Sequence, residues 1–378
     1  MADKEEVIPF KAGSVDTIGM EIEFQLLDPL SLDLVEGILP LMECYPDSPY
    51  IKPEFIQNTV EVATPVCHSI EELHDQLRYL VKGLLSHCQE LGIKLCGSGT
   101  HPYSKRLAEI TPLQRYLDME QVEGYTSHTQ ITFATHIHLG MRSGDEAIAI
   151  MQALTPYLPL LIALSANSPY WRGHDTDYCS FRHFILAARR SYGEPPWFNH
   201  WQNFNEFFSV AQRIGIFKTI HDIHWDIRPR PHLGSLEIRV MDTQPTVTDA
   251  VALAAFLQML VAYLRSESVP VRHCAPNALQ DWINRDNYYK AAQQGLAARF
   301  FDEYRDISLP IVQLYSELNS RIDPVLIDPF TRACCKQLEE RVFAGGNAKR
   351  QRQLFKQYGD LKPMTDCLVN MLEKDLAK

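Results

Sequence analysis

The feature that most constrains the fold of this chain is a set of short segments. In each of them, apolar and ionisable residues alternate strictly. Between positions 19 and 26 the even residues are apolar and the odd ones are small or polar: Met20, Ile22, Phe24 and Leu26 against Gly19, Glu21, Glu23 and Gln25. Successive side chains of a strand point to opposite faces, so this period of two predicts a β-strand with one apolar face and one acidic face.

Four further segments repeat the pattern: the neighbourhood of Glu61, then residues 131–139, 224–228 and 235–241. The predicted polar faces carry Glu61, His136, His138, Asp226, Arg228, Glu237 and Arg239, and the last of them also includes Met241. Five such strands favour an α+β fold, in which a mainly antiparallel sheet packs on helices by its apolar face. The other face is expected to be polar and concave.

Helical patterns lie between these strands and dominate after them. Ser69 and Glu72 resemble a capping box that opens a helix through Leu91, and residues 145–166 read as a second helix kinked at its two prolines. A third is expected at residues 249–265, and the remaining third of the chain is also helical in pattern. We therefore predict one domain over residues 10–378, with a sheet-rich core at about 15–245 and a helical part at about 246–378.

Composition excludes several classes of protein. The net charge of −11 argues against a nucleic-acid surface, although a few arginines and a metal can still bind a small anion. Nine cysteines without a C-x-x-C pair suggest reduced thiols. Residues 1–15 do not resemble a signal peptide, and the longest apolar stretch, Ala250–Leu264, is shorter than the roughly 20 residues of a membrane span. We expect a cytoplasmic protein without membrane contact.

The paired carboxylates of the first strand suggest metal chemistry. Glu21 and Glu23 project side by side on one face and could grip one or two hard cations, although a solvated sheet face would look the same. His136 and His138 form a similar pair, of which we expect one to bind metal and the other to meet phosphate or substrate. Recurrence of ionisable groups on five strands favours a site.

Arginines beside these groups suggest an anion. Glu237 and Arg239 could be a surface ion pair, or a metal ligand beside a bidentate phosphate ligand, and Arg228 and Arg230 could add positive charge. Two polar loops, at residues 97–102 and 167–182, could cover the sheet or carry recognition groups. Neither a P-loop nor a dinucleotide-binding motif is present in the sequence.

Several blocks of sequence together resemble a known family. They are Ile18-Gly-Met-Glu-Ile-Glu-Phe24, Val60-Glu-Val-Ala-Thr64, Gly99-Thr-His-Pro102, Thr135-His-Ile-His-Leu-Gly-Met141, Asn167-Ser-Pro, Asp175-Thr, His224-Trp-Asp-Ile-Arg-Pro229 and Gly234-Ser-Leu-Glu-Ile-Arg-Val-Met-Asp242. In this order the chain resembles carboxylate–amine ligases of the glutamate–cysteine ligase 2 type, within the glutamine-synthetase-like superfamily. The likeness runs from about residue 18 to 242 and weakens beyond.

The resemblance implies a sheet curved into a funnel that binds ATP and Mg²⁺ or Mn²⁺ on its polar face. It implies formation of an amide between amino-acid-like substrates through an acyl phosphate, with weak glutamate–cysteine ligase activity, and a homodimer. By position, the implied metal ligands are Glu21, Glu23, Glu61, His136 and Glu237. Arg239 and Arg228 would be catalytic and bind nucleotide together with His138, and substrate binding is assigned to Arg182, Thr100 and His101. Glu54 differs in parity from Glu61 and is left out.

One departure and three alternatives accompany this prediction. Where family members often carry an arginine, this chain has Gln293, which leaves the substrate open. A Glu/His cluster also suits a two-metal hydrolase, and ATP with arginines also suits a kinase of a carboxylate or guanidino group. A metal-binding or ligand-binding module without activity is the third alternative.

Overall fold

The computed structural model describes residues 8–266, 276–302, 305–322 and 328–378. The first seven residues of the N-terminal stretch lie outside these ranges. Within them, seven strands form one sheet: β1 (Ile18–Leu27), β2 (Ile51–Pro53), β3 (Thr59–Ala63), β4 (Lys94–Cys96), β5 (Ala134–Gly140), β8 (Ile227–Arg230) and β9 (Ser235–Asp242). Their order is β2-β3-β1-β5-β9-β8, and β4 pairs with the C-terminal end of β1. All of these pairings are antiparallel, as predicted.

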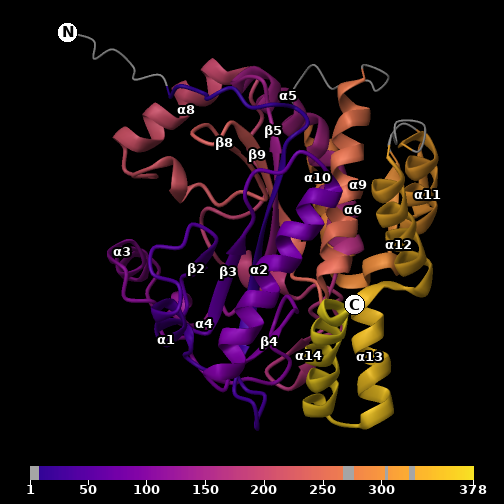
Figure 1. The fold of residues 1–378 in the computed structure, drawn as a ribbon. Helices are drawn as coiled ribbons and strands as arrows, with labels where there is room; N and C mark the ends of the chain where they lie inside the picture. The colour runs from indigo at the N-terminus through magenta and orange to yellow at the C-terminus, as the bar shows by residue number, and fades with distance from the viewer. Residues whose placement is uncertain (1–7, 267–275, 303–304, 323–327) are drawn as a thin grey trace.

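Helices surround this sheet (Figure 1). In the first two thirds of the chain they are α1 (Ile38–Glu43), α2 (Ile70–Glu90), α3 (Gln114–Glu123), α4 (Tyr125–Thr129), α5 (Gly144–Leu154), α6 (Leu158–Ser165), α7 (Arg182–Leu186), α8 (Trp201–Arg213) and α9 (Val247–Arg265). Beyond them lie α10 (Ala278–Gln294), α11 (Ile311–Ile322), α12 (Pro329–Ala344), α13 (Gly346–Tyr358) and α14 (Leu361–Ala377). Short 3₁₀ turns cover Thr155–Tyr157, Ile220–Asp222 and Gly295–Ala297.

The apolar face of the sheet packs on α2, α5, α6 and α9. Even-numbered residues of β1 from Ile18 to Leu26 are at most 1% exposed and join one core with the buried side of α2. Figure 1 shows α2 crossing the sheet, with α9 beside it and α12 outside α9. The Ser69 hydroxyl accepts a hydrogen bond from the Glu72 N–H, which confirms the predicted start of α2.

The C-terminal third is helical, as predicted, but it also holds a hairpin that the pattern did not reveal. Strands β10 (Arg299–Asp302) and β11 (Ile307–Pro310) pair antiparallel between α10 and α11. A second short pair, β6 (Tyr170–Trp171) and β7 (His174–Asp175), lies in the loop before α7. Both pairs are too short for a periodic signal to stand out from the surrounding sequence.

Three details of the predicted strands are wrong. The strand expected over residues 224–228 begins only at Ile227 and runs to Arg230. The strand expected from Ile131 begins only at Ala134, because the Phe133 backbone bonds to Gly99 and Thr243, and Phe133 packs in a separate apolar cluster with Leu27. Met241 was expected on the polar face but is fully buried in the core. The cause is a β-bulge in β9: one residue between Thr135 and Ile137 faces two residues between Ile238 and Met241, which reverses the alternation.

Two helical stretches are apolar and long enough to cross a membrane by composition alone, Gly144–Ser165 and Val247–Arg265. In the most apolar 18-residue part of each stretch, the share buried inside the protein is 72% and 67%, respectively. Such burial is typical of core helices. Both stretches belong to the helical layer that packs on the apolar face of the sheet. Within the described ranges, free thiols occur as expected at Cys44, Cys67, Cys88, Cys96, Cys179, Cys334 and Cys367, and Cys274 lies outside those ranges.

Candidate active site

The polar face of the sheet forms the floor of a pocket of about 260 Å³, called the polar pocket below. Its floor carries Glu21, Glu23, Glu61, His136, Arg228, Arg230 and Arg239, and its rim includes Glu54, Arg115, Tyr116, Arg182, Arg189, Tyr192, His221 and His224. Strand register explains the floor. Glu23 lies opposite Glu61, Glu21 opposite His136, and His138 opposite Glu237. Five strands distant in sequence thus bring their ionisable faces together, as the alternation predicted.

Glu21, His138 and Glu237 form the tightest group of metal-type ligands within the described residues. One donor atom from each lies within 4.8 Å of the others. His138 Nε2 is 3.5 Å from Glu21 Oε1, and His138 Nδ1 is 3.2 Å from the Ser235 hydroxyl. A serine that holds one ring nitrogen leaves the other free for a cation, which is how metal-binding histidines are usually oriented. His138 Nε2 is indeed buried without a hydrogen-bond partner among the described residues.

His136 lies between the carboxylates and an arginine. Its Nδ1 is 3.3 Å from Glu21 Oε2 and 3.5 Å from Arg239 Nη1, and its Nε2 is 4.0 Å from Glu23 Oε1. Burial and the Arg239 charge lower the pKa of His136 to about 3, so the ring is neutral at neutral pH. Both histidines therefore lie close to the Glu21 carboxylate, and of the two only His138 has a serine that orients its ring.

Carboxylates crowd the β1 and β3 side of the pocket. Burial and the Glu54 charge raise the pKa of Glu23 to about 8, and burial with the charges of Glu21 and Glu54 raises the pKa of Glu61 well above its usual value. Lys52 partly offsets the charge of Glu61, with its Nζ 3.3 Å from Glu61 Oε1, and Arg182 and Arg239 act on Glu23. A divalent cation would relieve this repulsion and displace the protons, which is the behaviour of a metal site.

Glu54 belongs to this group although its parity excluded it from the prediction. It follows the end of β2 instead of lying on β3, so counting from Glu61 along one strand did not apply. Its side chain lines the polar pocket, and one carboxylate oxygen accepts a hydrogen bond from the Phe55 N–H at 2.9 Å. The sequence signal that could have identified Glu54 is that it is an acidic residue close to an expected strand.

Three arginines converge on Glu237, which is fully buried. Arg228 makes two bonds to its carboxylate, at 2.8 and 3.2 Å, Arg230 makes one at 3.2 Å, and Arg239 makes a fourth. Burial alone would raise the pKa of Glu237, but the guanidinium groups of Arg228 and Arg239 hold it well below the usual range. Three cations around one carboxylate leave a positive excess, which suits a polyphosphate.

Arg182 lines the polar pocket but is held by the protein around it. Its guanidinium donates to the carbonyls of Val240 and Arg239, at 3.3 and 3.2 Å, and lies 4.0 Å from Asp242 Oδ1. Its Nε has no hydrogen-bond partner within the described ranges. The buried Nε–H of Arg182 is therefore a donor that a substrate could engage.

Asp242 explains several of the sequence blocks. Its carboxylate accepts hydrogen bonds from the Asn167 N–H and from the hydroxyls of Ser168 and Ser180. Gly99 lies against it so closely that a Cβ there would be 2.6 Å from Asp242 Cγ. These contacts hold the loop before α7 against the sheet. The sequence blocks that contain Gly99, Asn167 and Asp242 therefore have a structural role.

Thr100 and His101 lie outside the polar pocket. The Thr100 hydroxyl donates to the Tyr170 carbonyl at 2.8 Å. His101 Nε2 is 2.8 Å from the Leu32 carbonyl, and its Nδ1 accepts from the Ser104 N–H. Both side chains are 1% exposed, so neither can meet a substrate in this conformation.

Gln293 also lies outside the set of residues that line the polar pocket. It lies near the C-terminal end of α10, where its carbonyl accepts a hydrogen bond from the Cys179 N–H at 3.0 Å. Its side chain is not among the residues that line the pocket. The departure from the family pattern therefore leaves the carboxylates and arginines described above unchanged.

The rim includes residues that the alternation could not reveal. Tyr192 stacks parallel to His224, with ring centroids 5.4 Å apart, and Arg189 lies over the Tyr192 ring. His224 Nδ1 is 3.1 Å from the Ser191 hydroxyl. Arg189 and Tyr192 come from irregular loops, which have no period to detect, whereas His224 opens the segment 224–228 whose alternation had assigned it to the polar face.

The fold is similar to that of solved ligases of the glutamate–cysteine ligase type. A crystal structure of glutamate–cysteine ligase from Francisella tularensis in complex with AMP superposes with a TM-score of 0.69 and 14% identity, covering 97% of this chain and 90% of that one. A bifunctional glutathione synthetase from Pasteurella multocida gives 0.68 and 13%, covering 97% of this chain and 52% of that one. At these identities the likeness shows the fold alone.

The chain belongs to glutamate–cysteine ligase family 2 (GCS2), a family of ATP-dependent carboxylate–amine ligases, and the family profile matches residues 17–366. A relative from Trichormus variabilis, provisionally named glutamate–cysteine ligase 2, is 41% identical over 372 residues, covering 98% of this chain and 96% of its own. A relative of the same provisional name from Thermobifida fusca is 33% identical, covering 96% and 92%. The predicted family and the α+β fold are thereby confirmed.

Proposed function

We propose that this protein uses ATP to join the carboxylate of one amino-acid-like substrate to the amine of another, with weak glutamate–cysteine ligase activity. The observation that carries this proposal is the division of one pocket into two halves. Glu21, Glu23 and Glu61 make one half acidic, and the arginines around Glu237 make the other half basic. Acidic groups suit a divalent cation, and arginines suit the phosphates that it accompanies.

The donor set fits Mg²⁺ or Mn²⁺. It is rich in carboxylate oxygen and includes one oriented imidazole, whereas a zinc site would have more nitrogen or sulfur. We assign Glu21, His138 and Glu237 to one ion, and Glu23, Glu61 and Glu54 to a second. When bound, the metal neutralises phosphate charge and orients the transferred phosphoryl group.

The chain's own residues position the reactants. Arg239 has an unpartnered Nε, among the described residues, for a phosphate oxygen, while Arg228 is fixed on Glu237 and the carbonyls of His221 and Ile223. We assign Arg239 to the transferred phosphoryl group and Arg228 to holding Glu237 and the local positive charge in place. Neutral His136, next to Arg239, can accept a hydrogen bond without adding charge.

The reaction proceeds in two steps. A carboxylate oxygen of the first substrate attacks the γ-phosphorus of ATP, a bond to that oxygen forms, and ADP leaves. The amine of the second substrate then attacks the acyl carbon, loses a proton, and releases phosphate with the former carboxylate oxygen. The amide retains the other carboxylate oxygen.

Isotope transfer tests this sequence. Purified enzyme is incubated with ATP, Mg²⁺, cysteine and glutamate labelled with ¹⁸O in its γ-carboxylate, and the released phosphate is analysed by mass. One ¹⁸O per phosphate is expected, together with a product whose mass is the sum of both amino acids minus water. Because glutamate and cysteine come from the names of relatives, a matrix of other amino acids and amines is run in parallel.

The same experiment separates the alternatives. A two-metal hydrolase would release unlabelled phosphate or turn over without ATP, and a kinase would give a phosphorylated substrate and no amide. Background phosphate release with every pair would refute the proposal and favour a binding module.

Location and assembly remain predictions. A substrate as abundant inside cells as ATP favours the cytoplasm, as the sequence does. The homodimer implied by the resemblance is checked by light scattering of the purified full chain. Neither affects the geometry of the polar pocket, which one chain builds.

A further inference from the structure

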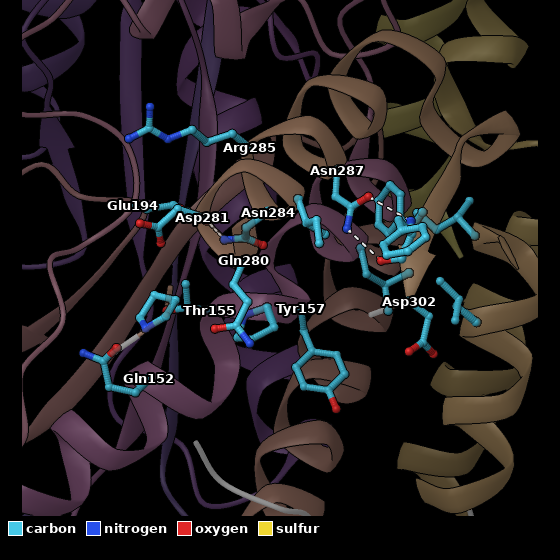
Figure 2. Close-up of a pocket in the computed structure, with 18 of the residues that line it drawn as sticks. Gln152, Thr155, Tyr157, Glu194, Gln280, Asp281, Asn284, Arg285, Asn287 and Asp302 are labelled. Carbon is cyan, nitrogen blue, oxygen red and sulfur yellow. Dashed lines mark hydrogen bonds between the residues drawn. The ribbon is translucent and has the colours of Figure 1, made fainter. Parts of the chain in front are cut away.

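A second and larger cavity, of about 630 Å³, lies between the N-terminal half of α10, α11 and the segment 194–197. We call it the α10 cavity. Figure 2 shows Glu194, Asp281 and Asn284 gathered at one end of it, with Asp302 at a distance from them. Its volume lies within the range of about 300–1,000 Å³ that small-molecule sites occupy.

The α10 cavity is separate from the polar pocket. Among the described residues, none lines both. The segment between them is the shared wall: Arg189 and Tyr192 face the polar pocket, and Glu194 and Trp197 face the α10 cavity. The wall is fixed to the sheet by a hydrogen bond from the Asp226 N–H to the Gly193 carbonyl at 2.9 Å. A molecule in the α10 cavity is thus outside the catalytic floor.

The charged residues that line the α10 cavity are distributed unevenly. At one end Arg305 pairs with Asp302 at 3.4 Å and with Glu317 at 2.8 Å, and Arg321 lies near Glu317. This end is balanced, with two carboxylates and two guanidinium groups.

The other end has an excess of negative charge. Two carboxylates, Glu194 and Asp281, line this end beside one described arginine, Arg285, whose guanidinium lies over the Trp282 ring. Glu194 is also near Asp226, on which Arg182 and Arg239 act. Asn284 donates one hydrogen bond to the Glu194 carboxylate. Burial and the neighbouring carboxylates of Asp226 and Asp281 raise the pKa of Glu194 to about 7, against the opposing effect of Arg285.

Apolar groups complete the cavity. Leu160, Phe300, Ile311 and Leu314 line it together with the prolines at 156, 195 and 196. The cavity thus combines apolar side chains with charged groups at its two ends, and such a combination suits a small organic molecule that carries a charge.

We propose that the α10 cavity binds a small organic cation, an amine with an apolar body, whose ammonium group pairs with Glu194. The ligand is bound and not consumed, since the wall separates it from the polar pocket. This site goes beyond the ligase activity and does not depend on it.

Calorimetric titration of the full chain without ATP tests the proposal. The probes are 2-phenylethylamine and its uncharged counterpart 2-phenylethanol, at pH 8. The amine should bind with one site per chain, and the alcohol at least about tenfold more weakly, because it lacks the charge-assisted bond. Absence of saturable amine binding up to millimolar concentration, or equal binding of both probes, overturns the proposal.

Two variants locate the binding. Glu194→Gln keeps the shape and an acceptor for Asn284, and it should weaken amine binding at least about tenfold. The matched control is Glu317→Gln, which alters a carboxylate of the same cavity that Arg305 already neutralises, and binding should stay within about twofold of wild type. Leu314→Trp, a filling variant at the apolar wall, should abolish binding. Unchanged affinity in Glu194→Gln, or in Leu314→Trp, refutes the assignment.

Product analysis separates this site from the ligase reaction. With ATP, Mg²⁺ and glutamate present, 2-phenylethylamine should be recovered unchanged. An amide that contains it would show that the amine reaches the polar pocket and would overturn the assignment as a separate site. Since the titrations need no ATP, failure of the ligase proposal leaves their result intact.

Discussion

Replacing Ser235 by alanine tests the proposed metal group without touching a metal ligand. The Ser235 hydroxyl lies 3.2 Å from His138 Nδ1 and fixes the ring so that Nε2 points at Glu21 and Glu237. Without this bond the imidazole can rotate and lose its preferred tautomer. Partners of this kind typically contribute 10–100-fold to metal affinity, or about 1.4–2.7 kcal/mol.

The chain offers a matched control. Ser191 makes the same kind of contact, 3.1 Å from His224 Nδ1, but His224 lies on the rim, away from the carboxylate group. Both changes remove one side-chain hydrogen bond, and each should cost about 1 kcal/mol of folding stability. Metal affinity alone should therefore separate the two variants.

The assay is Mn²⁺ binding to purified protein, followed by the electron paramagnetic resonance signal of free Mn²⁺. Ser235→Ala should raise the dissociation constant about 10–100-fold, and Ser191→Ala should leave it within about twofold of wild type. Equal affinity of Ser235→Ala and wild type, or an equal loss in both variants, would refute the role of His138 as an oriented metal ligand.

Three further changes probe other parts of the structure. His138→Ala should weaken Mn²⁺ binding at least about tenfold more than His136→Ala, and the reverse order would move the metal to His136. Arg239→Ala should lower ATP-dependent phosphate release about 10³-fold, with only partial recovery in Arg239→Lys, and near-normal turnover in a folded variant contradicts the phosphate role. Because the pKa of Glu194 rises from 4.5 to about 7, its ionisation destabilises the fold as pH rises through this range. Glu194→Gln should therefore gain up to about 3 kcal/mol relative to wild type between pH 4.5 and pH 8, measured by urea unfolding, and a gain independent of pH would exclude this cause.

The alternation of apolar and ionisable residues determined much of the fold. Because a strand turns successive side chains to opposite faces, Glu21 and Glu23 could be assigned to a polar face from sequence alone. The same argument brought Glu61, Glu237 and the two histidines to one surface, and the structure confirms that they share it. Local capping signals, such as Ser69 at the start of α2, were equally readable.

Periodicity failed where the backbone left regular geometry. The bulge in β9 turned Met241 into the core, and no local signal marked it. Glu54 was missed because it follows a strand instead of lying on one. Thr100 and His101 belong to one of the blocks on which the resemblance to the family rests, yet in the structure the Thr100 hydroxyl bonds to the Tyr170 carbonyl and His101 to the Leu32 carbonyl.

The sequence by itself determined that paired carboxylates and arginines would share the polar face of an antiparallel sheet. Only the tertiary structure decided that His138 has a serine to orient it, that three arginines surround Glu237, and that an uneven charge remains at Glu194. Face assignment follows from the local geometry of one strand. Distances between side chains, and cavities such as the one beside α10, arise from contacts between segments far apart in the chain, which no local pattern encodes.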